Sequence, residues 1–201
     1  MNPLKSVTGT IVSGFILALI LTVIFTQALD PGNAVWSWVV WFHVLAGVVW
    51  IGLLYYFNFV QVPAVGAATA DSDGPGPAAI NKYVAPRALL WFRWGAVVTW
   101  LTGAIALEVM SPQGVSGFVS AFTFQSGWAV IGAGAWLGTI MLFNVWVLIW
   151  PNQKKILGIV EASDEEKAKA KVVALMASRT NTLLSIPMLM CMVGHGHGVL
   201  F

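Results

Sequence analysis

The sequence predicts an all-α membrane protein, a bundle of five transmembrane helices with the N-terminus inside and the C-terminus outside. Three observations predict this fold. Of the 201 residues, 58% are hydrophobic and only 9% are charged, five apolar stretches are long enough to cross a bilayer, and all basic residues fall on one side of them. A soluble domain carries about 25% charged residues, which cover its water-facing surface. The surface of this protein must therefore be solvated by lipid.

Five stretches have the length that a membrane span requires. The hydrocarbon core is about 30 Å thick and a helix rises about 1.5 Å per residue, so a span needs roughly 20 mostly apolar residues. We expect these helices to form a single transmembrane domain over residues 1–201. Their predicted ranges are about 10–27, 35–61, 89–110, 127–150 and 177–200.

A shorter helix is expected on the cytoplasmic surface over about residues 160–172. This segment is rich in charge, and Asp164 with Lys167 and Glu165 with Lys169 have i,i+3 and i,i+4 spacing. Such pairs are typical of a solvated helix face.

The Lys and Arg residues predict the orientation. With five spans, all of them lie before the first helix, around the connection between the second and third, or around that between the fourth and fifth. Because cytoplasmic segments carry an excess of Lys and Arg, this side is predicted to be the cytoplasm of a bacterial inner membrane. A net charge of only +2 gives no reason to expect nucleic acid as a partner. The ten basic residues are Lys5, Lys82, Arg87, Arg93, Lys154, Lys155, Lys167, Lys169, Lys171 and Arg179.

Polar and small residues inside the spans predict how the helices pack. Asn58, Asn144 and Asn181 are expected to form hydrogen bonds between helices. Gly134 and Gly138 are four residues apart and predict a close approach of two helices.

The three histidines are the residues best suited to chemistry. His43 lies about eight residues below the outer end of the second helix, and His195 and His197 lie near the outer end of the fifth. Ionisable groups inside a membrane are costly and usually have a function. Two neutral imidazoles on facing helices can hold a b-type haem. Gly47, one turn after His43, would leave room for the macrocycle on the same helical face.

The sequence leaves several choices open at these histidines. His195 and His197 are about 200° apart around a continuous helix, so only one of them would face inward as the second ligand. The alternatives to haem are another metal, such as copper, and the absence of any cofactor. Glu108, the acid inside the third span, either orients one of the histidines or lies at the interface.

Four groups of residues follow one another in an order typical of a known family. In this order they resemble the membrane domain of the urate oxidase N-terminal family, bacterial membrane-bound urate hydroxylases that often carry a C-terminal cytochrome c domain. The groups are Trp41–Gly52 (WFHVLAGVVWIG); Leu90–Trp94 (LWFRW) with Thr99–Gly103 (TWLTG); Gly138–Met141 (GTIM) with Asn144 and Pro151–Lys155 (PNQKK); and Asn181–Pro187 (NTLLSIP).

The resemblance implies a helical membrane core that passes electrons to cytochrome c. It maps the family's helix-two histidine to His43 and its terminal histidine to His195 or His197. The sequence contains no CxxCH haem-attachment motif, so the cytochrome c is expected to be a separate protein. The second helix, with His43, Trp50, Gly52 and Tyr55, also resembles that of small membrane protoporphyrinogen oxidases.

Three functions follow from these observations. The leading one is electron transfer through a b-type haem near the outer leaflet, held by His43 and one of His195 or His197, with an external cytochrome c or partner subunit. The first alternative is a membrane oxidoreductase acting on a urate-like or porphyrin substrate, so that catalysis itself is left open. The second is a cofactor-free accessory subunit of a larger respiratory or photosynthetic complex.

Overall fold

The computed structural model describes residues 2–25 and 31–198. These residues are mostly helical and include no strand, which confirms the all-α class. The chain divides into two units, Met1–Ser37 and Trp38–Phe201, which are described separately.

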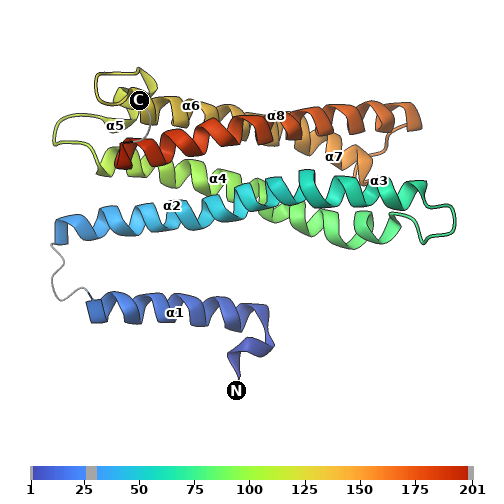
Figure 1. The fold of residues 1–201 in the computed structure, drawn as a ribbon, viewed down its shortest axis with the longest axis horizontal. Coiled ribbons are helices and arrows are strands. Elements are labelled where there is room, and N and C mark those ends of the chain that lie inside the picture. The colour runs from blue at the N-terminus through green and yellow to red at the C-terminus, as the bar shows by residue number, and fades with distance from the viewer. Residues whose placement is uncertain (1, 26–30, 199–201) are drawn as a thin grey trace. The chain divides into compact units, whose positions relative to one another are not determined.

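The first unit consists mainly of the apolar helix α1 (Val7–Phe25), shown in blue in Figure 1. A short 3₁₀ turn, η1 (Pro3–Lys5), precedes it, and the backbone N–H of Leu4 donates to Oδ1 of Asn2 at 2.9 Å. The segment Val7–Ile24 has a mean hydropathy of 2.4 and no buried residue. A helix that is apolar on every side is suited to lipid rather than water.

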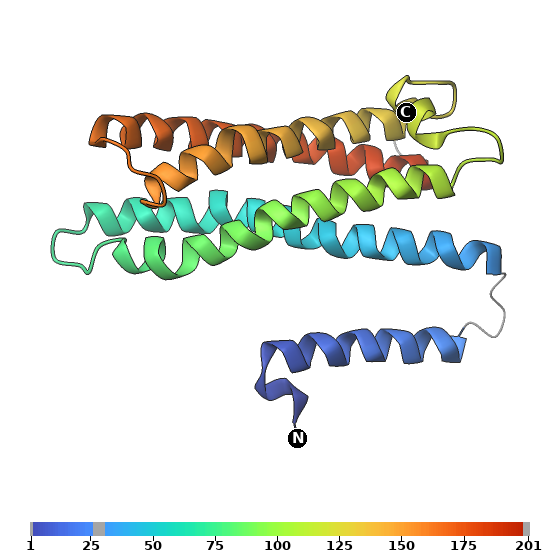
Figure 2. The same cartoon turned by 180° about the vertical axis from the view of Figure 1, so that it is seen from behind.

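The second unit is built from long helices that run back and forth (Figures 1 and 2). Three of them contain π-helical segments, η2, η3 and η4, that continue directly into α-helix. In chain order the elements are α2 (Pro31–Tyr56), η2 (Phe57–Gln61), α3 (Val62–Ala70), η3 (Ile80–Val84), α4 (Ala85–Val109), α5 (Gly117–Phe122), α6 (Ala129–Phe143), η4 (Asn144–Ile149), α7 (Trp150–Ile156) and α8 (Asp164–His197).

Five helices of the described residues are long and apolar enough to cross a membrane, as the sequence predicts. The second runs on to Ala70 and the third begins at Ile80, so both extend further toward their connection than expected. The short helix α5 between α4 and α6 is an addition that the hydropathy pattern does not predict.

The charged segment expected as a separate helix over about 160–172 is instead the beginning of α8. The side chains of Ser163 and Glu166 form a reciprocal capping box at its start. No Gly or Pro occurs between Asp164 and Ile186, and Ala, Glu and Lys favour helix. The helix therefore continues from the charged segment into the span. The pairs Lys167–Asp164 at 3.8 Å and Lys169–Glu165 at 2.7 Å confirm the predicted charge spacing.

The hydrophobic core of the second unit joins α2, α4, α6, η4 and α8. Trp50 and Leu54 from α2 pack with Phe92 from α4, and Met141 and Met188 from α6 and α8 complete the same cluster. All five side chains are buried. This cluster fixes α2 and α4 against the α6–α8 pair.

Asparagines connect the helices inside this apolar core, as predicted. Nδ2 of Asn144 donates to Oδ1 of Asn181 at 2.8 Å, and Nδ2 of Asn181 donates to the carbonyl oxygen of Met141 at 2.9 Å. On η2, Nδ2 of Asn58 donates to Oγ of Ser178 at 2.8 Å. Each bond ties another element to α8.

The close approach expected at the glycines of α6 occurs at Gly134. A Cβ atom there would lie 3.1 Å from Cβ of Cys191 on α8. At Gly138 a Cβ would meet no atom within 4 Å, so only the first of the predicted pair has the close contact.

The basic residues of the second unit lie in one half of the bundle. The α3–η3 and α7–α8 connections lie at one end, and the α4–α5 connection and the C-terminal end of α8 lie at the other (Figures 1 and 2). Arg93 from α4 packs over the ring of Trp150, 3.9 Å from its centroid. The half that carries the Lys and Arg residues is predicted to face the cytoplasm.

Replacing Asn181 tests the buried hydrogen bonds. Asn181→Ala should destabilise the protein by about 1–2 kcal/mol, because it removes two interhelical bonds and leaves the amide of Asn144 without its acceptor. Thermal unfolding in detergent measures the effect. Thr180→Ala, at the neighbouring exposed position, should leave the unfolding temperature unchanged, and equal shifts in both variants would contradict the assignment.

Cysteine labelling tests the orientation. In a Cys191→Ser background, Gln113→Cys on the α4–α5 connection should react with a membrane-impermeant maleimide added to intact cells. Ser72→Cys on the α3–η3 connection should react only after lysis, because the positive-inside rule predicts that the basic side is cytoplasmic. The reverse labelling pattern would show that the protein is inserted the other way round.

Candidate histidine site

His43 is held against α4 by a hydrogen bond to the backbone. Its Nδ1 lies 2.8 Å from the carbonyl oxygen of Thr99, and its side chain is partly buried. A carbonyl oxygen only accepts, so the ring proton must be on Nδ1. The hydroxyl of Thr102 lies 3.3 Å from the same nitrogen but donates to the carbonyl oxygen of Val98 at 2.7 Å.

This hydrogen bond leaves the other ring nitrogen available. With the proton on Nδ1, Nε2 of His43 carries a lone pair, and no hydrogen bond of the described residues engages it. Histidines that bind metals usually donate their second ring N–H to a carbonyl or carboxylate, which fixes the ring and raises its basicity. The imidazole of His43 therefore has the tautomer and the support of a metal ligand.

Gly103 makes room for the ring. A Cβ atom at Gly103 would lie 2.9 Å from Cε1 and 3.2 Å from Nδ1 of His43. These distances are shorter than normal van der Waals contact, so a side chain at position 103 would displace the imidazole from the Thr99 carbonyl. The residues that position His43 are thus Thr99 and Gly103, one turn apart on α4.

The sequence contains a signal for this arrangement that periodicity alone does not reveal. The segment TWLTG places Thr99, Thr102 and Gly103 on one face of a helix, at i, i+3 and i+4. Only the packing of α2 on α4 shows that His43 is the side chain in contact with this face of α4.

Gly47 lies on the same face of α2 as His43. A Cβ atom there would meet only Cγ2 of Thr99, at 3.8 Å. The face that carries His43 and Gly47 therefore runs along α4. Its use as space for a macrocycle stays a prediction.

The two C-terminal histidines differ in their surroundings. His195 is partly buried, and its ring stacks on that of Trp128, just before α6, with centroids 6.2 Å apart. His197 is exposed, and its Nδ1 lies 3.2 Å from the carbonyl oxygen of Val193 in its own helix. Because α8 stays helical through His197 and ends at Gly198 in the left-handed conformation, the two rings face different directions. His195 is the one that faces the bundle.

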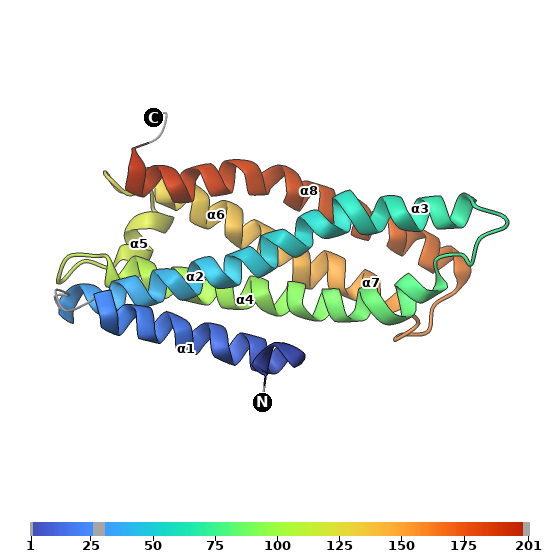
Figure 3. The same cartoon turned by 60° about the horizontal axis from the view of Figure 1, so that its bottom comes forward.

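His43 and His195 contact different neighbours. His43 packs against α4 and His195 packs by the start of α6. The helices that carry them, α2 and α8, meet at the hydrogen bond between the hydroxyls of Tyr55 and Ser185, 2.9 Å apart. Figure 3 shows α2 crossing in front of α6 and approaching α8 at its end, where α3 begins. No group of three or more His, Cys, Asp or Glu residues that could hold a metal ion occurs in residues 2–25 and 31–198. A haem needs only two imidazoles, so the haem prediction does not depend on such a group.

Glu108 has a structural role in the α4–α5 connection. Its Oε1 accepts hydrogen bonds from the hydroxyl of Ser116 at 2.7 Å and from the backbone N–H of Phe118 at 3.0 Å. It therefore ties the end of α4 to the first turn of α5. The group that orients His43 is the Thr99 carbonyl and not this carboxylate.

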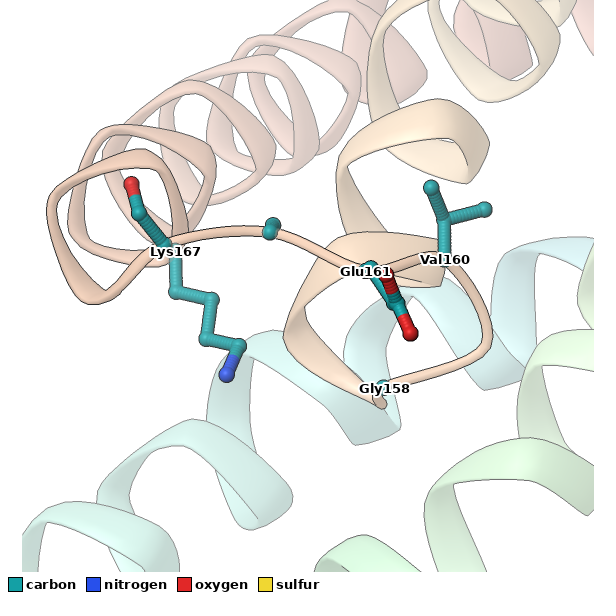
Figure 4. A pocket seen from close by; sticks show the side chains of 6 residues that line it. Gly158, Val160, Glu161 and Lys167 are labelled. Carbon is teal, nitrogen blue, oxygen red and sulfur yellow. The ribbon is translucent and has the colours of Figure 1, made fainter.

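A hollow of about 640 Å³ lies at the α7–α8 connection, in the basic half of the bundle. Glu161 and Lys167 are its charged residues (Figure 4), and the hydroxyl of Ser163 accepts the backbone N–H of Glu166 at the start of α8. It contains no histidine or cysteine, so it offers no ligand for the predicted redox chemistry.

The model of the family described as urate oxidase N-terminal matches residues 105–201, just under half of the chain. This match confirms the family resemblance found in the sequence. It includes His195 and His197 but begins after His43 and the face of α4 that holds it. No protein of curated function and no solved structure matches the chain.

Substitution of Gly103 tests the packing of His43. Gly103→Ala should cost about 1–3 kcal/mol of stability, the typical effect of inserting a methyl group into a packed site. Gly52→Ala on α2 is the matched control, because its Cβ would meet no atom within 4 Å, and it should be neutral or slightly stabilising. Thermal unfolding in detergent compares the two. A Gly103→Ala variant as stable as the wild type would contradict the contact with His43.

Proposed function

From the match of residues 105–201 to the urate oxidase N-terminal family, and from the geometry of His43, we propose that this chain is a membrane electron-transfer protein. It binds a b-type haem near the outer leaflet of a bacterial inner membrane through His43 and one of the C-terminal histidines. It exchanges electrons with a cytochrome c or a partner subunit on the outer side. The observation that carries the proposal is the 2.8 Å hydrogen bond from Nδ1 of His43 to the Thr99 carbonyl oxygen.

That bond supplies what an axial ligand needs from its protein. It holds the imidazole in one tautomer, leaves the Nε2 lone pair outside any hydrogen bond of the described residues, and increases the electron density on the ring. Gly103 allows the ring to lie close to α4, so its orientation is set by backbone atoms. When bound, a haem supplies reversible one-electron chemistry, which the side chains of this protein lack.

The C-terminal histidines are the candidates for the second haem ligand, because they lie toward the same end of the bundle as His43. His195 faces α6 and is partly buried, whereas His197 is exposed, and burial excludes water from a metal site. We therefore favour His195 as the partner of His43. Both belong to the half of the bundle that lacks Lys and Arg, which the positive-inside rule places outside.

A second candidate function is oxidation of a urate-like substrate. The family match favours it, because the family description is that of a urate oxidase N-terminal region. Turnover of urate with cytochrome c as the acceptor would separate the enzyme from the carrier.

A reduced-minus-oxidised absorption spectrum of the purified protein tests the proposal. We expect the α-band of a b-type haem. His43→Ala should abolish the band, because α2 contains no other histidine. His195→Ala should abolish or shift it, and His197→Ala should leave it unchanged.

The outcomes discriminate between the functions. A flat difference spectrum for the wild-type protein, purified from cells that make haem, would overturn both redox functions and favour a cofactor-free accessory subunit. A band that persists in His43→Ala would show that another residue is the haem ligand. Loss of the band in His197→Ala but not in His195→Ala would exchange the roles of the two C-terminal residues.

A further inference from the structure

An open groove of about 420 Å³ lies between the end of α2 and the beginning of α4, remote from the histidines. Leu53 and Tyr56 line it from α2, and Ala88 and Trp91 line it from α4. Its walls are mainly apolar, and Arg87 lies among them. The volume is within the range of roughly 300–1,000 Å³ that small-molecule sites have.

The position of the groove along α2 favours the depth where lipid tails meet headgroups. The apolar helix that contains it runs over Val35–Ala70, and Tyr56 lies about 30 Å along this helix from Val35. That length equals the thickness of the hydrocarbon core. Tyr and Trp residues are enriched at this boundary, and the groove has three of them, Tyr56, Tyr83 and Trp91.

Arg87 lines the groove, Lys82 lies beside its lining residue Tyr83, and neither has an anionic partner among the described residues. Arg87 donates from Nη1 to the carbonyl oxygen of Tyr83, and Nζ of Lys82 lies 5.4 Å from the centroid of the Tyr83 ring. The ion pairs of the described residues all lie within residues 155–169, so no described carboxylate is within ion-pair distance of Arg87 or Lys82. A guanidinium has five N–H donors, and most of those on Arg87 remain free for another acceptor.

We propose that this groove is a binding site for an anionic phospholipid of the inner leaflet. The phosphate accepts hydrogen bonds from Arg87 with Lys82 nearby, and one acyl chain lies along Leu53, Ala88 and Trp91. Basic pockets between transmembrane helices on the cytoplasmic side are suited to anionic headgroups. A zwitterionic headgroup is disfavoured because its ammonium group would meet the same two cations. A polypeptide is disfavoured because the groove is open at the depth of the lipid.

Native mass spectrometry of the full chain in detergent tests the site. The protein is titrated with phosphatidylglycerol and, separately, with phosphatidylethanolamine of the same acyl chains. The first phosphatidylglycerol molecule that binds should have a lower Kd than the first phosphatidylethanolamine molecule. Arg87→Gln should raise the Kd of phosphatidylglycerol about fivefold, the effect of one basic residue at an anionic lipid surface. Lys82→Gln, at a second exposed position, should weaken it in the same direction.

The matched control is Arg179→Gln. Arg179 is an exposed cation on α8 outside the groove, so the change removes the same charge and should leave binding unchanged. An equal loss in Arg87→Gln and Arg179→Gln would overturn the site in favour of nonspecific charge attraction. Equal binding of the two lipids, or unchanged binding in both groove variants, would also overturn it. A dimer that dissociates in Arg87→Gln, without lipid release, would identify a second copy as the occupant.

Discussion

Polar groups inside a bilayer must find their partners within the protein, because hydrocarbon offers none. Many polar groups of the described residues meet this requirement, whereas Nε1 of Trp50, Nε1 of Trp146, Oδ1 of Asn58 and Oε1 of Gln61 are buried without a hydrogen-bond partner. Long helices pair the backbone groups of the spans. Asn144, Asn181 and the Met141 carbonyl pair with one another where α6, η4 and α8 meet. The same requirement accounts for His43, whose ring N–H is paired with a carbonyl of the neighbouring helix.

Asn181 and His43 differ in how completely their polar atoms are paired. Asn181 is satisfied at both ends of its amide, so it contributes to packing and leaves nothing for a ligand. His43 is satisfied at one ring nitrogen and leaves the other as a lone pair. A half-satisfied imidazole of this kind is expensive in a membrane unless something binds it, and this difference is the physical basis of the haem proposal. The two ends of the bundle carry different groups: the histidines lie toward one, and Arg87, Lys82 and the apolar groove lie toward the other.

The sequence predicts the spans better than their ends. Charge-rich residues over about 160–172 resemble a separate surface helix, but no Gly or Pro separates Asp164 from the span and Ala, Glu and Lys favour helix, so residues from Asp164 onward are the first turns of α8. The π-helical segments carry no hydropathy signal, although they contain Asn58 and Asn144. Glu108 illustrates the limit at single residues: its spacing permits a role beside a histidine, and its hydrogen bonds to Ser116 and Phe118 place it in a connection instead.

The sequence by itself determined that the helices of this protein are suited to lipid rather than water, and that the fold is all-α. Both follow from composition and from the length of apolar runs, which are properties of the chain alone. It also identified His43, His195 and His197 as the residues to consider. Only the tertiary structure decided that the Thr99 carbonyl and Gly103 hold His43, that His195 rather than His197 faces the bundle, and that Arg87 borders an apolar groove. These features depend on which faces of separate helices meet, and that is set by packing between residues far apart in the chain.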